Sequence, residues 1–129
     1  MDEKMNGFWE PWQEELRKKH SLFCPKGWYG FSCGPGWKDL IDRAFAKMKA
    51  AGWSGVIHQV KEKFGTLRMY VEGDGEVPIS EIIAEAVVES TKTCEGCGAP
   101  GVPRNSTYWM HTHCDKCEEE YLARNGLLK

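Results

Sequence analysis

Four cysteines near the C-terminal end of the chain have the spacing of metal ligands. Cys94 and Cys97 form one Cys-x-x-Cys pair, and Cys114 and Cys117 form a second pair after sixteen intervening residues. A two-residue gap brings both sulfurs of a pair to one face of a tight turn, and this arrangement is typical of four-thiolate zinc sites. Four protein sulfurs leave no open coordination position, so the sequence predicts one structural Zn²⁺ ion and not a hydrolytic centre.

The residues between the two pairs allow the chain to fold back on itself. Gly96 and Gly98 supply the φ freedom that a tight turn needs, and Gly and Pro residues follow at positions 100–103. Two histidines, His111 and His113, precede the second pair. Either imidazole could replace a cysteine as a zinc ligand, which would give a mixed nitrogen and sulfur shell.

Two further cysteines lie in a Gly/Pro-rich stretch at residues 24–36. Cys24 and Cys33 could join His20 and His58 at a second metal, or form a disulfide. A catalytic Cys33 working with His58 is a further alternative, but no local signature supports it. We expect two ordinary buried thiols, because free cysteine is among the most buried residue types.

Length and composition predict a single small domain without a strong charge bias. The chain has 129 residues, enough for a modest core that a metal site would reinforce. The formal net charge is −2, and residues 51–90 are the acidic part, with three basic and seven acidic side chains. The overall charge therefore does not support binding to nucleic acid or to an anionic membrane. Six tryptophans favour an aromatic core or an interaction surface.

Compartment is inferred from what the sequence does not contain. No apolar run is long enough to span a bilayer, and the first residues, MDEKMNGFWE, include no apolar segment resembling a signal peptide. Paired cysteines in a chain without an export signal suit a reducing environment. We therefore expect a cytoplasmic protein with no membrane partner.

Apolar periodicity predicts two core helices and a β-hairpin. Apolar residues recur three and four positions apart in residues 37–51 and 79–90, as they do on the buried face of a helix. The period changes to two in residues 56–60 and 66–71, which indicates two strands joined by a short turn. The strands and both helices would together enclose the core.

Two shorter helices complete the expected fold, at residues 11–20 and 115–124. The fold class is therefore α+β: a small antiparallel hairpin or sheet packed by two amphipathic helices, with a C-terminal zinc ribbon alongside. The expected parts are an N-terminal helical extension at 1–23, an α+β core at 24–91, and the ribbon with its helix at 92–129. We expect these parts to pack as one unit.

Alternation in the second strand gives the hairpin an inner and an outer face. The residues of the inner face are Leu67, Met69 and Val71. The outer face and the turn carry a cationic and aromatic cluster, which is the predicted partner-binding surface: Lys61, Lys63, Arg68 and Tyr70. The alternative is that these side chains pair with their acidic neighbours Glu62 and Glu72 and only keep the sheet soluble.

Three glutamates lie on the outward side of the helix expected at 79–90. Glu81, Glu85 and Glu89 recur four residues apart without a lysine partner on the same helix. Like charges at this spacing repel one another mildly. We expect a solvated helix face, and an acidic ridge that meets a basic partner is the alternative.

Three motifs occur in order along the chain: CGPGW at 33–37, QVKEKFGTLRMYV at 59–71, and CEGCGAPG with THCDKC within 94–117. Together they resemble a family of small proteins from tailed bacteriophages and prophages, and the hairpin motif is the most specific part. The resemblance covers about residues 20–120. It departs at the first twenty residues and at the two histidines beside the second cysteine pair. The resemblance implies a phage-infected bacterial cytoplasm and does not imply a reaction.

These features favour a binding function. The first hypothesis is a phage-encoded accessory protein that binds and modulates a host protein, inhibiting a defence or regulatory factor. Small size, a closed metal site and an excess of aromatic residues support it. The alternative is a zinc-ribbon protein that binds nucleic acid through the cationic outer face, with Tyr70 stacking on a base. Against this alternative, residues 91–129 carry five acidic and five basic side chains.

An enzyme is the third class. The only polar constellation worth naming combines His58, Lys61, Glu62 and Arg68, and it matches no catalytic signature. Arg68 fits an ion pair with a neighbouring glutamate at least as well as a catalytic role. We therefore expect binding and not catalysis.

Overall fold

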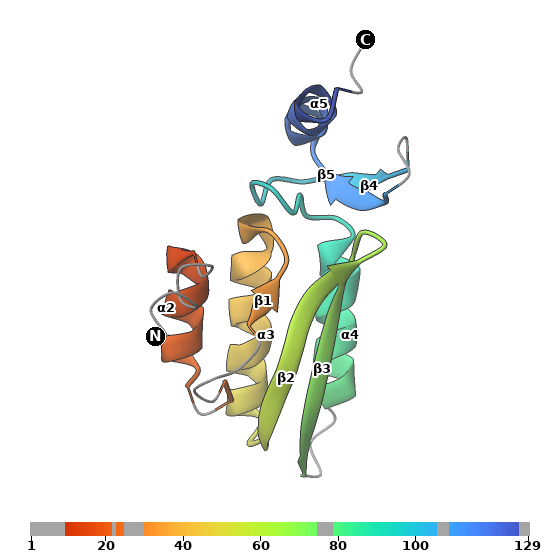
Figure 1. Cartoon of the computed structure of the whole chain (residues 1–129). Coiled ribbons are helices and arrows are strands. Elements are labelled where there is room, and N and C mark those ends of the chain that lie inside the picture. Colours follow the sequence, from red (N-terminus) through yellow and green to blue (C-terminus); the bar gives the residue numbers. More distant parts are fainter. Residues whose placement is uncertain (1–9, 22, 25–29, 75–78, 106–108, 127–129) are drawn as a thin grey trace.

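The computed structural model describes residues 10–21, 23–24, 30–74, 79–105 and 109–126 (Figure 1). The described chain mixes helices with small sheets, which confirms the predicted α+β class. Its elements in chain order are α2 (Pro11–Lys19), β1 (Phe31–Ser32), the 3₁₀ helix η1 (Pro35–Trp37), α3 (Lys38–Ala50), β2 (Ser54–Lys63), β3 (Thr66–Asp74), α4 (Ile79–Ser90), β4 (Val102–Arg104), β5 (His111–His113) and α5 (Asp115–Arg124). None of the helices in these ranges has the length and apolar character of a membrane span.

The larger sheet has three strands in the order β1-β2-β3. β2 and β3 form the predicted antiparallel hairpin, in which Val60 lies opposite Met69. The sequence pattern does not predict β1, which pairs in parallel with β2 and places Phe31 opposite Val60. A strand of two residues within a Gly/Pro-rich stretch is too short to show a period of two.

The hairpin turn consists of two residues. Lys63 pairs with Thr66 as the last rung of the ladder, so Phe64 and Gly65 make the turn. Both have positive φ, 56° for Phe64 and 83° for Gly65. Two positive φ values are the requirement of the type I′ turn, which matches the twist of paired strands and favours Asn-Gly or Gly-Gly. Phe64 therefore holds a backbone conformation that is unfavourable for a bulky side chain.

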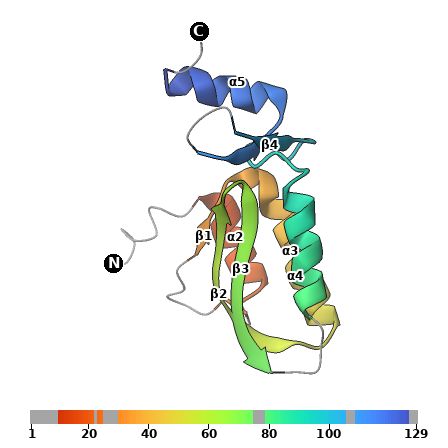
Figure 2. The same ribbon diagram turned by 90° about the vertical axis from the view of Figure 1, so that its right-hand side faces the viewer.

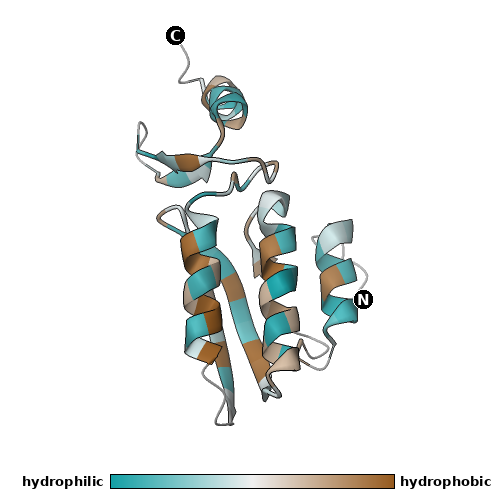
Figure 3. Cartoon of the chain, turned by 180° about the vertical axis from the view of Figure 1, so that it is seen from behind, coloured by the Kyte–Doolittle hydropathy of each residue, from teal (hydrophilic) through white to brown (hydrophobic). Residues whose placement is uncertain are grey.

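The core lies between the larger sheet and the helices α3 and α4, whose apolar stripes are visible in Figure 3. The fully buried side chains of the α3 region are Trp37, Ile41, Phe45 and Met48. The sheet contributes Ile57, Val60 and Leu67, which are also fully buried. These positions confirm the apolar periodicities that predict the core.

The first helix, α2, packs against the flank of α3. Its apolar side is thin in sequence, yet Trp12 and Leu16 are both buried. The Trp12 ring lies 5.3 Å from the ring of Phe31. The side-chain amide of Gln13 donates to the carbonyl of Phe31 at 3.1 Å. α2 thus covers one edge of the core and β1.

The glutamates of α4 meet basic side chains of α3. Lys47 Nζ lies 3.4 Å from Glu85 Oε1, and Arg43 pairs with Glu89. The partners missing from the helix itself therefore come from the neighbouring helix, which sequence spacing within one helix does not reveal. Two of the three glutamates therefore form exposed ion pairs between α3 and α4. Their side chains are 69% exposed for Glu85 and 44% exposed for Glu89, so this part of the helix face is solvated as expected.

The two cysteines outside the C-terminal segment are free thiols. Burial raises the pKa of Cys24 to about 12, and burial also raises the pKa of Cys33 above its usual range. His20 hydrogen-bonds Asp42 at 2.7 Å, and His58 hydrogen-bonds Glu72 at 2.7 Å. Neither a second metal site nor a Cys33–His58 dyad forms from these four residues, because the two histidines are engaged elsewhere.

A second, two-stranded sheet of β4 and β5, together with α5, lies at one end of helices α3 and α4 (Figures 1 and 2). The backbone N–H of Gly36 donates to the carbonyl of Glu95 at 2.7 Å. The indole N–H of Trp37 donates to the carbonyl of Thr93 at 2.8 Å. The start of α3 is thereby bonded directly to the segment that carries the first cysteine pair.

The hairpin turn provides the other support for this segment. The hydroxyl of Thr112 in β5 donates to the carbonyl of Gly65 at 2.7 Å, and Thr112 is fully buried. A Cβ on Gly65 would lie 3.2 Å from the Cα of His111. The C-terminal segment is therefore held at two places, the start of α3 and the tip of the hairpin.

Gly36→Ala should lower the free energy of unfolding by about 2 kcal/mol or more. A Cβ at position 36 would lie 2.1 Å from the carbonyl oxygen of Cys94, so the two backbones would have to separate. Gly52→Ala is the matched control: no atom lies within 4 Å of its Cβ, and its φ of +86° should cost only about 1 kcal/mol. Denaturant unfolding measures both variants, and equal losses would contradict the role of the close approach.

Candidate metal centre and adjacent cavity

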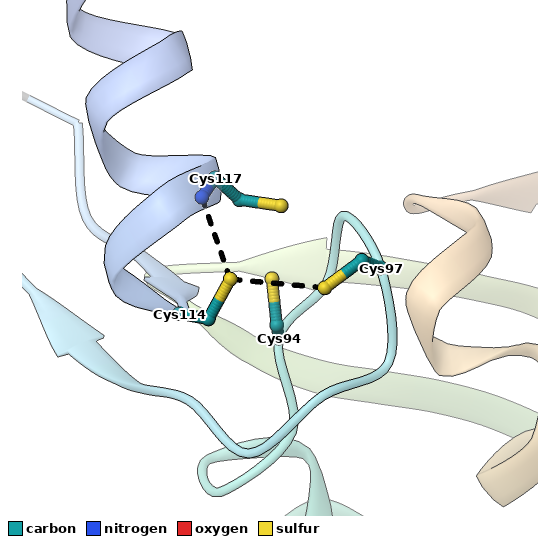
Figure 4. A group of neighbouring side chains, drawn as sticks. All are labelled: Cys94, Cys97, Cys114 and Cys117. Carbon is teal, nitrogen blue, oxygen red and sulfur yellow. Dashed lines mark hydrogen bonds between the residues drawn. The ribbon is translucent and has the colours of Figure 1, made fainter.

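The four cysteines of the C-terminal segment point toward one another (Figure 4). Their sulfur atoms all lie within 4.8 Å of each other, and Cys97 Sγ lies 3.7 Å from Cys114 Sγ. A tetrahedral ion with Zn–S bonds of about 2.3 Å would hold its sulfurs roughly 3.8 Å apart. The prediction that Cys94, Cys97, Cys114 and Cys117 come together is confirmed, and the arrangement is compatible with a metal site.

Local backbone structure explains why both pairs converge. The carbonyl of Cys94 accepts from the N–H of Gly98, whose φ of +86° closes the first turn. Cys114 is the N-cap of α5, and its sulfur accepts from the N–H of Cys117 at 3.4 Å. This N–H lowers the pKa of the Cys114 thiol to about 7, whereas burial raises the pKa of the Cys117 thiol above its usual range. Metal binding would require both thiols to lose their protons.

The two histidines beside the second pair do not join the four sulfurs. His111 Nε2 lies 2.7 Å from Glu118 Oε1, and His113 Nδ1 lies 3.0 Å from the same oxygen. Strand alternation turns both rings to one side of β5, toward the first turn of α5. The alternative in which one histidine replaces a cysteine is therefore not supported, because both histidines belong to a second group of potential ligands.

A cavity of about 880 Å³ lies where the hairpin turn, the first cysteine turn and β5 meet. It is lined by Gly34, Glu62, Lys63, Phe64, Glu95, Gly96, Trp109, Met110, His111, His113 and Tyr121. Its wall therefore combines apolar and aromatic side chains with five ionisable ones, a mixture that can bind a ligand or a partner side chain. Three of its side chains are conspicuously exposed at the surface: Phe64, Trp109 and Met110.

Glu95 connects the cavity to the core. Its carboxylate accepts from the N–H of Gly34 at 2.8 Å, and its backbone carbonyl accepts from Gly36. Burial raises the pKa of Glu95 to about 7, the Gly34 N–H opposes the rise, and the negative charge of Glu62 adds to it. Metal-bound thiolates of the adjacent cysteines would act in the same direction, because they also place negative charge nearby.

The predicted partner-binding residues lie on the outer face of the hairpin. Lys61 in β2 lies directly opposite Arg68 in β3, and Tyr70 lies opposite Gln59. Within the described ranges, none of the three cationic side chains of this surface forms an ion pair. The expected acidic partners are engaged elsewhere, since Glu62 accepts from the N–H of Gly65 and Glu72 pairs with His58. The binding role of this surface stays a prediction.

Lys63 is the member of this surface that also lines the cavity. Its ammonium group lies 5.5 Å from the centre of the Phe64 ring. The outer face of the hairpin is thus continuous with the cavity mouth through the turn. Phe64, Trp109, Met110 and Glu118 are the site residues that sequence reasoning misses. Only the unusual Phe-Gly turn and the His-x-His run before Cys114 give any sign of them.

The fold and the site together define a small α+β protein with a four-cysteine cluster at one end of its core and a cavity between the two. Comparison with protein-family models, with curated proteins and with solved structures gives no match. The function is therefore argued from the geometry of the described residues and from the sequence motifs.

Glu95→Gln should raise thermal stability more at about pH 8 than at about pH 5.5. The folded protein holds the Glu95 proton more tightly than the ordinary value of 4.5, so the free energy of unfolding falls as pH rises from about 4.5 to about 7 and stays low above that. In the variant, the amide oxygen can still accept from the N–H of Gly34, and the side chain no longer carries a charge. Glu120→Gln, an exposed change of the same charge, is the control. Thermal melts across this range measure both; a variant that follows the wild-type pH profile would refute the argument.

Proposed function

We propose that this protein binds another protein through the surface formed by the hairpin turn and the cavity mouth, while a zinc ion in the four-cysteine cluster holds the C-terminal segment in place. One observation carries the proposal. Phe64 is 61% exposed and occupies a left-handed position of a two-residue turn, where a glycine or asparagine would fit without strain.

The interactions of Phe64 within the isolated chain at most offset the cost of its backbone conformation. An exposed ring gains little from burial, and the left-handed backbone costs roughly 1 kcal/mol. Its contact with Lys63 at 5.5 Å is a cation–π interaction at an exposed site and contributes about 0.5–1 kcal/mol. Local strain that the fold itself does not need is typical of functional positions.

The neighbouring exposed side chains have the composition of a binding hot spot. Trp109 is 68% exposed and Met110 is 42% exposed, and both line the same cavity as Phe64. Aromatic residues and methionine are enriched at protein interfaces, where a few of them supply most of the binding free energy. The adjoining cationic face of the hairpin would add orientation and association rate.

Zinc in the four-cysteine cluster has a structural role in this proposal. Four sulfurs close the coordination shell, and the β4–β5 hairpin between the two pairs supports a zinc-ribbon arrangement. The resemblance to tailed-phage proteins supports a host protein as the partner and the bacterial cytoplasm as the place. A reducing compartment keeps the thiols available for metal.

One tightly held zinc ion per chain should resist dialysis against a chelator at moderate concentration. Its X-ray absorption spectrum should show sulfur ligands only. The double change Cys97→Ser and Cys117→Ser should lose this ion and unfold the C-terminal segment, because structural zinc contributes folding free energy of about 10 kcal/mol or more. Cys24→Ser, at a free thiol outside the cluster, is the matched control. Retention of the ion by the double variant would end the structural-zinc proposal.

The partner surface can be tested without disturbing the fold. Phe64→Asn converts the turn to Asn-Gly, the preferred type I′ sequence, so the variant should be at least as stable as the wild type. Loss of a central aromatic contact should weaken partner binding by about 2 kcal/mol, roughly 30-fold. Lys61→Glu combined with Arg68→Glu tests the outer face in the same assay.

The assay uses the affinity-tagged chain to capture partners from bacterial lysate with and without nuclease treatment, followed by calorimetry with the purified partner. Val88→Asn on α4 is the control, since it removes a 55%-exposed apolar side chain outside this surface. Unchanged affinity of Phe64→Asn would refute the proposed surface. If binding disappears on nuclease treatment and weakens steeply with added salt, the partner is a nucleic acid and not a protein.

A further inference from the structure

Three potential metal ligands lie together outside the four-cysteine cluster. They are the imidazoles of His111 and His113 and the carboxylate of Glu118. Glu118 Oε1 lies 2.7 Å from His111 Nε2 and 3.0 Å from His113 Nδ1, and the three donor atoms lie within 4.8 Å of one another. The Glu118 side chain is only 8% exposed, so the group is part of the interior of the segment.

The backbone directs these three donors to one point. His111 and His113 alternate with Thr112 along β5, so both rings lie on one face while Thr112 bonds Gly65 on the other. Glu118 lies in the first turn of α5, where its N–H donates to the carbonyl of Cys114. The His111 and His113 rings lie 4.3 Å apart, which is close enough for both to contact one ion.

This group is distinct from the four-cysteine cluster although the two interleave in sequence. Cys114 and Cys117 supply sulfur to the cluster. Glu118 follows Cys117 directly, and successive residues of a helix project about 100° apart. The order His-x-His-Cys-x-x-Cys-Glu therefore sends its sulfur ligands to one site and its nitrogen and oxygen ligands to another.

The donor set and spacing fit a divalent transition metal. An ion with bonds of about 2.0–2.1 Å to nitrogen and oxygen would hold tetrahedral ligands roughly 3.3 Å apart. The Glu118 oxygen lies 2.7 Å from the His111 nitrogen and 3.0 Å from the His113 nitrogen, so the donors would separate by a few tenths of an ångström when the ion binds. Two imidazoles with one carboxylate suit zinc and also ferrous iron. A divalent ion would also compensate the buried carboxylate with positive charge.

We propose that His111, His113 and Glu118 form a second metal site, which binds a divalent first-row transition ion and keeps at least one coordination position open toward the cavity. Three protein ligands leave that position for water or for a donor atom of a bound ligand. Both histidines line the 880 Å³ cavity, so the open position faces a space large enough for a small molecule or a partner side chain. The proposal is independent of the protein-binding function.

The ring of Tyr121 completes the surroundings of the site. It lies 4.4 Å from the His111 ring and 5.7 Å from the His113 ring, and it also lines the cavity. Its packing against both imidazoles restricts their rotation, so the donors are oriented before metal arrives. The second site would thus be preorganised by the fold, in contrast to a chance pair of surface histidines.

Cobalt titration of the full-length protein tests the proposal, after the protein has been loaded with one equivalent of zinc and dialysed against a chelator so that zinc fills the sulfur cluster only. With the sulfur cluster filled by zinc, one equivalent of Co²⁺ should bind and give weak visible absorption without thiolate-to-cobalt charge transfer. His113→Ala should weaken this binding by about 100-fold or more, since even loss of an outer partner of a ligand costs 10–100-fold. His58→Ala, which changes an exposed histidine on the hairpin, should bind Co²⁺ as the wild type does.

A second variant keeps the test decisive if His113→Ala destabilises the segment. Glu118→Gln keeps the size of the side chain and removes the charged ligand, and it should also weaken Co²⁺ binding while the zinc of the sulfur cluster is retained. If the wild type binds no Co²⁺ in addition to the zinc of the sulfur cluster, the proposal is overturned. The three side chains are then only a hydrogen-bonded His–Glu–His cluster. Equal Co²⁺ binding by the wild type and Glu118→Gln would overturn it as well.

Discussion

The contact on which the rest of the structure depends is the backbone approach between the start of α3 and the first cysteine turn. Gly36 donates to the carbonyl of Glu95 at 2.7 Å, and the Glu95 carboxylate accepts from Gly34 at 2.8 Å. Side chains at either glycine would clash with this segment, because a Cβ would lie within 2.5 Å of its carbonyl oxygens. The cavity exists because the cysteine segment is fixed to the core at the start of α3, while the hairpin turn supports the segment at β5.

Sequence patterns predict the helices and strands whose apolar residues recur periodically, and they do not predict where separate elements meet. The α3 stripe ending at Met48 and the alternation around Leu67 have periods of 3.6 and 2, so helices and hairpin follow from sequence alone. The cysteine pairs are predictable because a metal requires fixed ligand types and spacing. The parallel strand at Phe31 has no period, and the meeting of Glu118 with His111 depends on where α5 begins, which no pattern specifies to one residue.

The two groups of potential ligands share one piece of backbone, and this has a consequence for their order of formation. Cys114 caps α5, and the same helix turn carries Cys117 and Glu118. Zinc bound by the sulfurs would therefore fix the start of α5 and with it the carboxylate of the second group. His111 and His113 are held separately, because Thr112 between them is bonded to the hairpin turn. Metal binding at the first site would prepare the second without any contact between the ions.

The hairpin turn has to satisfy two demands that conflict. Its backbone must reverse in two residues with positive φ and present the Gly65 carbonyl to Thr112, which favours small residues at both positions. Only Gly65 follows that preference. Phe64 departs from it, and its exposed ring lines the cavity that Trp109 also lines and is not part of the core. Local energetics and residue choice disagree at this exposed position, and the partner contact proposed for the turn would account for the disagreement.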